Sequence, residues 1–172
     1  MKGLTSLQML FIYQCSSLAK LPEWLGELRS LQHLNVSRCP MMTSLPQSME
    51  QLTSLVRLKI DGWGNLKQLP EVIQHLTSLQ ELELVLCSAL TVLPEWIGCL
   101  SELRHLSIID CSALQSLPHS IQCLTALQGL FTDNCPDLAQ RYKKGVGEDW
   151  HLIRTMWLAS GRPKRPRLSM ST

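Results

Sequence analysis

The stretch LQELELVLCSALTVLPEWIGCLSE, residues 79–102, has a pattern of apolar residues that returns along most of the chain. Its Leu-Pro corner recurs at a spacing of 24 residues, as Pro22, Pro46, Pro70, Pro94 and Pro118. The near-copies LPEWLGEL (21–28) and LPEWIGCL (93–100) lie three such steps apart. A fixed period of this length indicates a repeat array.

Each repeat has two halves with different apolar periods. In the first half, Leu82 and Leu84 alternate with Glu83, which is the period of a half-buried strand. In the second half the apolar spacing widens to three or four residues after Pro94, which fits a short helical turn that begins with proline. One unit cannot bury its leucines alone, so neighbours must stack. We therefore predict an α/β solenoid, horseshoe- or arc-shaped, of about six 24-residue repeats, with a parallel sheet on the concave face and short helical turns on the convex face.

The pattern also predicts the organisation of the chain. The repeats cover residues 1–138, because Leu138 is the last leucine in register and Arg141 takes the next apolar position. Residues 139–160 are expected to form a C-terminal cap region. Residues 161–172 are basic and rich in proline and serine, which predicts a disordered tail. A nuclear address or a nucleic-acid contact is the alternative for this tail.

Composition excludes several classes of function. The net charge of +2 over 172 residues gives no global attraction to polyanions, so no nucleic-acid partner is expected. No apolar run approaches the ~18 residues of a membrane-spanning helix, so no membrane association is expected either. The sequence contains no motif for a metal site or for catalysis: C-x-x-C, H-E-x-x-H and G-x-S-x-G are all absent. We therefore predict no enzyme activity and no metal.

One position of the repeat forms a column of cysteines with a single tryptophan. Successive strands lie about 4.8 Å apart with parallel Cβ directions, and a disulfide requires the two side chains to turn toward each other. We therefore interpret the column as a structural ladder of reduced, buried thiols, with a disulfide framework as the alternative. Its members are Cys15, Cys39, Trp63, Cys87, Cys111 and Cys135.

The full unit, LxxLxLxxCxxLxxLPxxIxxL, resembles the leucine-rich repeats of plant nucleotide-binding disease-resistance proteins, which are intracellular immune receptors. The resemblance covers residues 4–138, and CPDLAQRYKKGVGEDWHLI at 135–153 resembles the end of the array in grass members. Extracellular plant receptors resemble LxGxIP at the corner instead, and repeats of the Ras-adaptor type have 23 residues with N-x-L after the strand.

The resemblance implies a sensor and autoinhibitory domain in the defence response. Its partner would be a protein: a pathogen effector, a modified host protein, or the nucleotide-binding domain of the parent receptor. It also implies a cytoplasmic location, with the nucleus possible. A phosphate-binding loop, GxxxxGK[ST], is absent, so no nucleotide or other cofactor is expected. The alternative function is a stand-alone leucine-rich repeat adaptor scaffold without an immune role.

The candidate recognition residues are the open positions of the strands, which point away from the leucines. These positions differ from repeat to repeat while the leucines do not, and binding residues on rigid scaffolds are often placed this way. Opposite charges on neighbouring strands can also be simple cross-strand pairs. An exposed apolar group such as Val85, Leu86 and Ile109 favours a partner site, and the alternative for Leu86 is a side chain that turns into the corner of the repeat. The candidates are Phe11, Tyr13, His33, Asn35, Arg57, Lys59, Glu81, Glu83, Val85, His105, Ile109 and Phe131.

Overall fold

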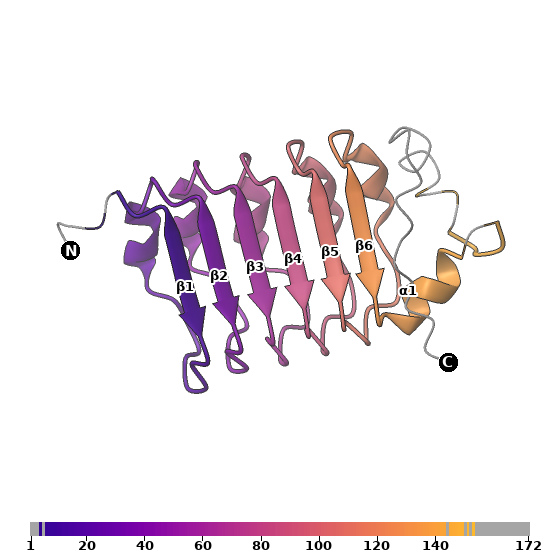
Figure 1. Ribbon diagram of the computed structural model, residues 1–172, viewed down its shortest axis with the longest axis horizontal. Helices are drawn as coiled ribbons and strands as arrows, with labels where there is room; N and C mark the ends of the chain where they lie inside the picture. Colours follow the sequence, from indigo (N-terminus) through magenta and orange to yellow (C-terminus); the bar gives the residue numbers. More distant parts are fainter. Residues whose placement is uncertain (1–3, 5, 144, 150, 152, 154–172) are drawn as a thin grey trace.

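The computed structural model describes residues 4, 6–143, 145–149, 151 and 153. Its parallel strands form one open sheet in chain order, in the foreground of Figure 1. They are β1 (Met9–Tyr13), β2 (His33–Ser37), β3 (Arg57–Asp61), β4 (Glu81–Val85), β5 (His105–Ile109) and β6 (Gly129–Asp133). Behind the sheet lie the 3-10 helices η1 (Glu23–Glu27), η2 (Gln47–Gln51), η3 (Glu71–His75), η4 (Glu95–Cys99) and η5 (His119–Cys123). The predicted α/β repeat solenoid is thereby confirmed.

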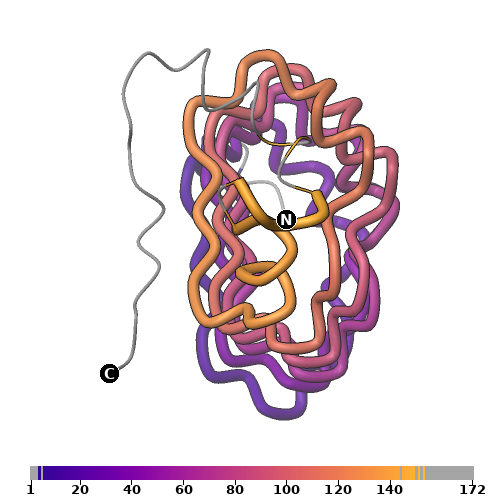
Figure 2. The backbone as a smooth tube through the Cα atoms, turned by 90° about the vertical axis from the view of Figure 1, so that its right-hand side faces the viewer, coloured from indigo at the N-terminus to yellow at the C-terminus, as the bar shows by residue number. Residues whose placement is uncertain are grey.

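Equivalent residues of successive repeats lie side by side. Leu34 pairs with Leu58 and Leu58 with Leu82, and every neighbouring pair of strands keeps this offset of one repeat. Viewed along the long axis, the coils superpose into one elongated tube (Figure 2). Each position of the repeat therefore becomes a row that crosses the sheet.

The core is a continuous stack of leucine rows between the sheet and the 3-10 helices. Leu34, Leu58 and Leu82 are at most 1% exposed, because a coil covers each of them on both sides. At the first coil Leu10 and Ile12 are only partly buried, since only one side has a neighbouring coil among the described residues. This difference is the expected behaviour of stacked repeats, in which each unit completes the core of the next.

The repeated stretch LPEW(L/I)G ties one coil to the next on the helical side. The Glu95 carboxylate accepts the backbone N–H groups of Ser120 at 2.9 Å and His119 at 3.3 Å, and Glu23 accepts the N–H of Ser48 at 3.0 Å. These backbone hydrogen bonds lower the pKa of both carboxyls. The first N–H groups of a helix have no partner within the helix, so each glutamate supplies one from the preceding coil.

The glycine of the same stretch permits close packing of these coils. A Cβ atom on Gly26 would lie 2.2 Å from the backbone oxygen of Ser48. The equivalent atom on Gly98 would lie 2.6 Å from the oxygen of Ser120. Both distances are well inside van der Waals contact. The two near-copies in the sequence therefore mark the two places where η1 meets η2 and η4 meets η5 most closely.

A left-handed residue follows every strand. The φ angles are positive at Gln14, Arg38, Gly62, Leu86, Asp110 and Asn134, between 52° and 69°. This conformation turns the N–H of the residue toward the last carbonyl of the next strand, as in the 2.9 Å bond from Leu86 to Ile109. Glycine and asparagine adopt this region readily, whereas leucine does so rarely. The turn after β4 therefore holds Leu86 in a backbone conformation that leucine disfavours.

The cysteine column lies at the corner beneath these turns. The Cys111 thiol donates to the carbonyls of Ile109 at 3.5 Å and Leu84 at 3.7 Å, and Cys87 and Cys135 make the equivalent bonds. Trp63 occupies the column in its repeat and donates its Nε1–H to Val36 at 3.0 Å. All seven cysteines have free thiols, and the ladder cysteines are buried as predicted except Cys15 on the first described coil, which is only partly buried. Burial raises the pKa of the Cys135 thiol to about 11, so this thiol is protonated at neutral pH.

Helix α1 (Pro136–Arg141) packs across the end of the stack (Figures 1 and 2). Leu138 is buried, and the Tyr142 hydroxyl accepts the N–H of Leu117 at 3.0 Å. Burial raises the pKa of this hydroxyl. Helix α1 contains residues on both sides of the predicted boundary at 138. Residues 154–172, which include the predicted basic tail and the end of the predicted cap region, lie outside the described residues.

Candidate functional site

The outer face of the sheet carries the candidate residues, and we call it the strand face. Strand geometry points alternate side chains to opposite faces, so the leucines point inward and the residues between them outward. The structure places the twelve predicted residues on the strand face, distributed over all six strands, and each is at least partly exposed. Ser37 is an exception among the outward positions, because it is short and lies between the larger Tyr13 and Asp61.

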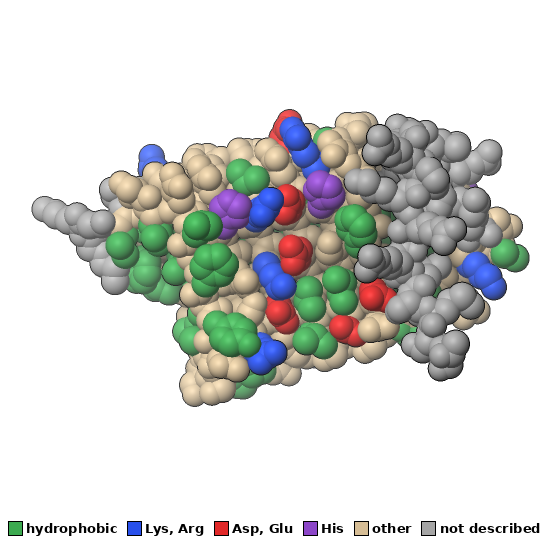
Figure 3. All heavy atoms as spheres, in the orientation of Figure 1, with side chains coloured by type: hydrophobic (Ala, Val, Ile, Leu, Met, Phe, Trp, Pro, Cys, Tyr) green, Lys and Arg blue, Asp and Glu red, His purple; other side chains and the backbone are tan. Residues whose placement is uncertain are grey.

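A band of paired charges crosses the middle of the strand face. Arg57 on β3 contacts Glu81 on β4 at 2.8 Å, and Lys59 contacts Glu83 at 3.4 Å and Asp61 at 3.9 Å. Figure 3 shows these basic and acidic side chains together near the centre of the face. Exposed pairs of this kind contribute about 0–1 kcal/mol. A partner that offers its own charges could therefore replace them at little cost.

Apolar side chains lie on both sides of this band. Met9, Phe11 and Tyr13 on β1 are 53–63% exposed, and among the described residues β1 has a neighbouring strand on one side only. The Arg38 guanidinium lies 5.2 Å from the centre of the Tyr13 ring, which is the distance of a cation–π contact. On the other side, Val85 on β4 lies beside Ile109 on β5.

The histidines of the strand face are far apart. His33 and His105 occupy the same row but lie three strands apart, about 14 Å at the usual strand spacing. His105 stacks on the Phe131 ring, with 6.4 Å between ring centres. Within the part of the chain that the structure describes, no group of three or more His, Cys, Asp or Glu side chains is arranged to hold a metal ion.

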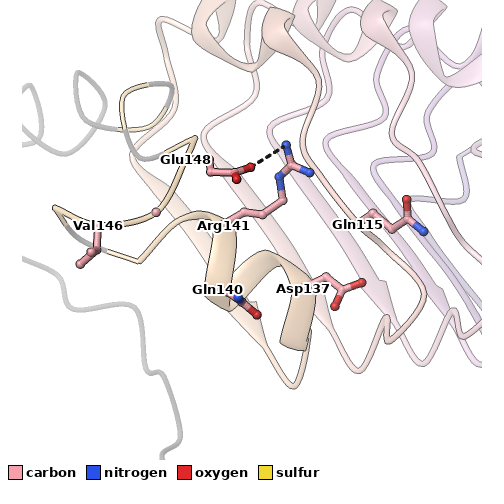
Figure 4. Close-up of a pocket in the computed structure, with 7 residues that line it drawn as sticks. Gln115, Asp137, Gln140, Arg141, Val146 and Glu148 are labelled. Carbon is pink, nitrogen blue, oxygen red and sulfur yellow. Dashed lines mark ion pairs between the residues drawn. The ribbon is translucent and has the colours of Figure 1, made fainter.

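A hollow lies beside α1. The residues that line it are Gln115, Asp137, Gln140, Arg141, Val146, Gly147 and Glu148 (Figure 4). The one cation among the lining residues, Arg141, already pairs with Asp149 at 2.7 Å and with Glu148 at 3.8 Å. These contacts raise the pKa of Arg141 further. The one described cation that lines the hollow is therefore already paired and is not open to an anionic ligand, so the strand face is the better candidate.

Sequence reasoning placed Leu86 at the turn without resolving which way it points. The structure shows a side chain that is 50% exposed on a left-handed backbone. Gly62 and Asn134 occupy the same position of their repeats, and these residue types favour that conformation. Glycine and asparagine at this position of the repeat were the sequence signal for a left-handed turn. They did not indicate that Leu86 adopts the same backbone conformation.

The comparisons with known proteins identify the family. The family model of the leucine-rich repeat region matches residues 1–108, so the chain belongs to the leucine-rich repeat proteins. The fold and the family together define a module for protein–protein interaction. No curated protein sequence matches the chain significantly. No helix among the described residues is long and apolar enough to cross a membrane.

Solved structures show the same fold in different settings. The leucine-rich repeat domain of the type III effector XopL is 26% identical over 80% of this chain and 64% of its own, with a TM-score of 0.50. The Arabidopsis receptor kinase HAESA, in complex with the peptide hormone IDA and the co-receptor SERK1, is 22% identical over 72% of this chain and 22% of its own, with a TM-score of 0.51. Drosophila Toll, in complex with Spatzle, is 19% identical over 79% of this chain and 22% of its own, with a TM-score of 0.56. The chain spans less than two thirds of each of these proteins.

Proposed function

We propose that this chain is a recognition module of a plant intracellular immune receptor of the nucleotide-binding leucine-rich repeat class, and that its strand face binds the partner. One observation carries the proposal: outward residues differ on every strand, while inward residues are almost uniformly leucine, isoleucine or valine. A rigid sheet that presents a varied surface is suited to recognition, because the partner meets side chains whose positions are already fixed.

The plant-receptor part of the proposal rests on the repeat pattern itself. The L-P corner distinguishes the pattern from the extracellular receptor repeats, and the 24-residue period with a cysteine after five of the six described strands distinguishes it from the Ras-adaptor type. In the receptor class the partner would be a pathogen effector, a modified host protein or the nucleotide-binding domain of the receptor. A ligand that prefers the released state of such a receptor would shift its switch toward that state. We expect recognition alone from this chain, in the cytoplasm or nucleus, without catalysis.

The proposal is tested by affinity capture from plant extract with the full chain as bait. The test variant replaces Phe11, Lys59 and Val85, which lie on different strands of the strand face, with serine. The matched control replaces Gln51, Glu71 and Gln122 with serine, since these side chains are exposed or partly exposed on the helical side. Circular dichroism of all forms verifies the fold. The proposal predicts a protein that binds the wild type and the control and is lost from the test variant.

The same capture experiment can also refute the proposed role of the strand face. Partners that bind the test variant as well as the wild type would place recognition elsewhere on the molecule and refute a role for the strand face. The immune role is tested separately: the gene should encode a phosphate-binding loop in the same reading frame. A gene without this loop would favour the alternative, a stand-alone adaptor scaffold.

A further inference from the structure

A group of exposed side chains on β1 and after β2 forms what we call the β1–β2 surface: Met9, Phe11, Tyr13, Asn35 and Arg38. The three β1 residues are 53–63% exposed. Asn35 lies beside Phe11 in the strand register, and Arg38 directly follows β2. Strand geometry turns these β1 side chains to the outer face, whereas Leu10 and Ile12 between them point into the core. The β1–β2 surface is therefore part of the strand face and not of the core at the end of the stack.

The residue types of the β1–β2 surface are those that protein interfaces favour. Aromatic residues, methionine and arginine are enriched at interfaces, and tyrosine and arginine are frequent among the residues that contribute most to affinity. The Phe11 and Tyr13 side chains each have two rotatable torsions, so little conformational entropy is lost when a partner covers them. The part of the face on β3 and β4 instead presents charges that already pair with one another.

Arg38 is the cation of this surface, and it lies over an aromatic ring. Its guanidinium is 5.2 Å from the centre of the Tyr13 ring. A guanidinium that stacks on a ring keeps the N–H groups in its own plane available to an acceptor. No described carboxylate forms an ion pair with Arg38, whereas Arg57 and Lys59 both contact carboxylates. Because Arg38 is exposed, a partner can reach its N–H groups.

The described part of the first two repeats has its carboxylates on the helical side only. Residues 6–22 and 28–49 contain no Asp or Glu, and Glu23 and Glu27 lie in η1. On β3, next to the surface, Asp61 contacts Lys59 at 3.9 Å. Over β1 and β2, Figure 3 shows hydrophobic and basic side chains and no acidic ones. The β1–β2 surface is therefore both apolar and positively charged.

We propose that the β1–β2 surface binds a segment of a partner protein in which an aromatic or aliphatic side chain is accompanied by an aspartate or glutamate. The apolar side chain would cover Phe11 and its neighbours on β1, and the carboxylate would accept N–H groups of Arg38. A basic segment would be repelled by Arg38. This inference rests on the proposed recognition by the strand face, and it specifies the place on that face and the chemistry of the partner.

The register sets the spacing of the two groups in the partner. Asn35, which lies beside Phe11, and Arg38 are three residues apart, which is about 10 Å of extended chain. In an extended partner segment the carboxylate would therefore lie roughly two to four residues from the apolar side chain.

The test uses a displayed library of random twelve-residue peptides, selected on the immobilised full chain. Compared with the unselected library, enriched peptides should carry an aromatic or aliphatic residue within about four positions of an aspartate or glutamate. Their dissociation constants are then measured on the wild type, Phe11→Ser and Arg38→Gln. Each variant should bind at least about fivefold more weakly, because a central apolar contact or charge-assisted hydrogen bonds are removed. Arg29→Gln is the matched control, since it removes the same charge from the exposed turn after η1.

An exchange of charges tests the role of Arg38 more sharply. Arg38→Asp should lose the selected peptides and should bind versions of them in which the acidic residue is replaced by lysine. Gln14 and Asp110 occupy the equivalent position after β1 and β5, with the same positive φ. Both Arg38 variants should therefore keep the circular dichroism spectrum of the wild type. Wild-type affinity should fall as the salt concentration rises, and Arg38→Gln should reduce this dependence.

Several results would overturn the inference. Enriched peptides that are basic, an absence of enrichment, or equal binding to the wild type and Arg38→Gln would each refute it. Dimers of the free chain that form at high concentration and are lost with Phe11→Ser would make a second copy the occupant.

The capture experiment distinguishes this failure from a failure of the proposed function. A captured partner that still binds the variant of Phe11, Lys59 and Val85 refutes a role for the whole strand face. A partner that is lost from that variant but binds Arg38→Gln as it binds the wild type refutes only the role of the β1–β2 surface.

Discussion

Replacement of Gly26 by alanine tests the close packing of coils that the repeated LPEW(L/I)G stretch produces. The new Cβ would lie 2.2 Å from the Ser48 oxygen and 2.7 Å from the Ser48 Cβ. Ordinary contacts are longer than 3.4 Å for nearly all Cβ atoms. The atoms nearest to Gly26 include backbone, so side-chain rotation alone cannot relieve the overlap. The coil at η1 would have to move away from η2 by about 1 Å.

The size of the effect follows from two opposing contributions. Overpacking of this kind costs about 1–3 kcal/mol. Loss of glycine's freedom in the unfolded chain returns ~0.4–1 kcal/mol. Taken at the middle of both ranges, the net loss is about 1–2 kcal/mol. For a domain of this size each kcal/mol lowers the melting temperature by about 2–4 °C, so Gly26→Ala should melt roughly 2–8 °C below the wild type.

The assay is thermal unfolding followed by circular dichroism, with Gly64→Ala as the matched control. A Cβ on Gly64 would meet only the Ser88 Oγ, at 3.9 Å, so the control should melt at the wild-type temperature or slightly above. If Gly26→Ala and Gly64→Ala melted at the same temperature, the close approach of η1 to η2 would be refuted.

Three further predictions concern the core, the ladder and the caps. Leu82→Asp buries an unpaired charge at a fully buried position and should destabilise the array by more than ~4 kcal/mol, visible as loss of cooperative unfolding; unchanged unfolding would contradict the register. Trp63→Phe leaves the Val36 carbonyl without the indole donor, so the free energy of unfolding measured in urea should fall by about 1–3 kcal/mol. For the wild type, thiol titration of the denatured protein without reductant should count seven free thiols. Fewer thiols would indicate disulfides. Because the folded-state pKa of Glu23 and Glu95 is lowered, their ionised forms stabilise the fold above the usual value of 4.5, and this contribution is lost as the pH falls through the lowered pKa. Glu23→Gln with Glu95→Gln should therefore lose less stability than the wild type between about pH 5 and about pH 3, whereas parallel pH curves would argue against the two caps.

The architecture could be predicted from the sequence because each repeat contains the local signals for its strand, its corner and its helical turn. Alternation around Leu82 indicates the strand, Pro94 indicates the corner, and the constant period sets the register between neighbours. These signals are local and repeat without an insertion. The predicted position of each strand therefore does not drift from one repeat to the next. The separation of inward from outward residues followed directly from the same alternation.

Contacts between coils could not be predicted in the same way. The bond from Glu95 to the Ser120 backbone depends on how far one coil slides and tilts against the next, which the period does not determine. Leu86 illustrates a second limit, because its local preference opposes the backbone that the repeat imposes. The bonding partners of neighbouring coils therefore required coordinates.

If the strand face meets the partner, binding should slow hydrogen–deuterium exchange on that face. The full chain is measured alone and with the protein captured from plant extract. We predict slower exchange in the turns that follow β1 and β2, at residues 14–15 and 38–39, with the helical side at residues 95–99 and 119–123 unchanged. Protection confined to the helical side would show that the partner does not bind the strand face.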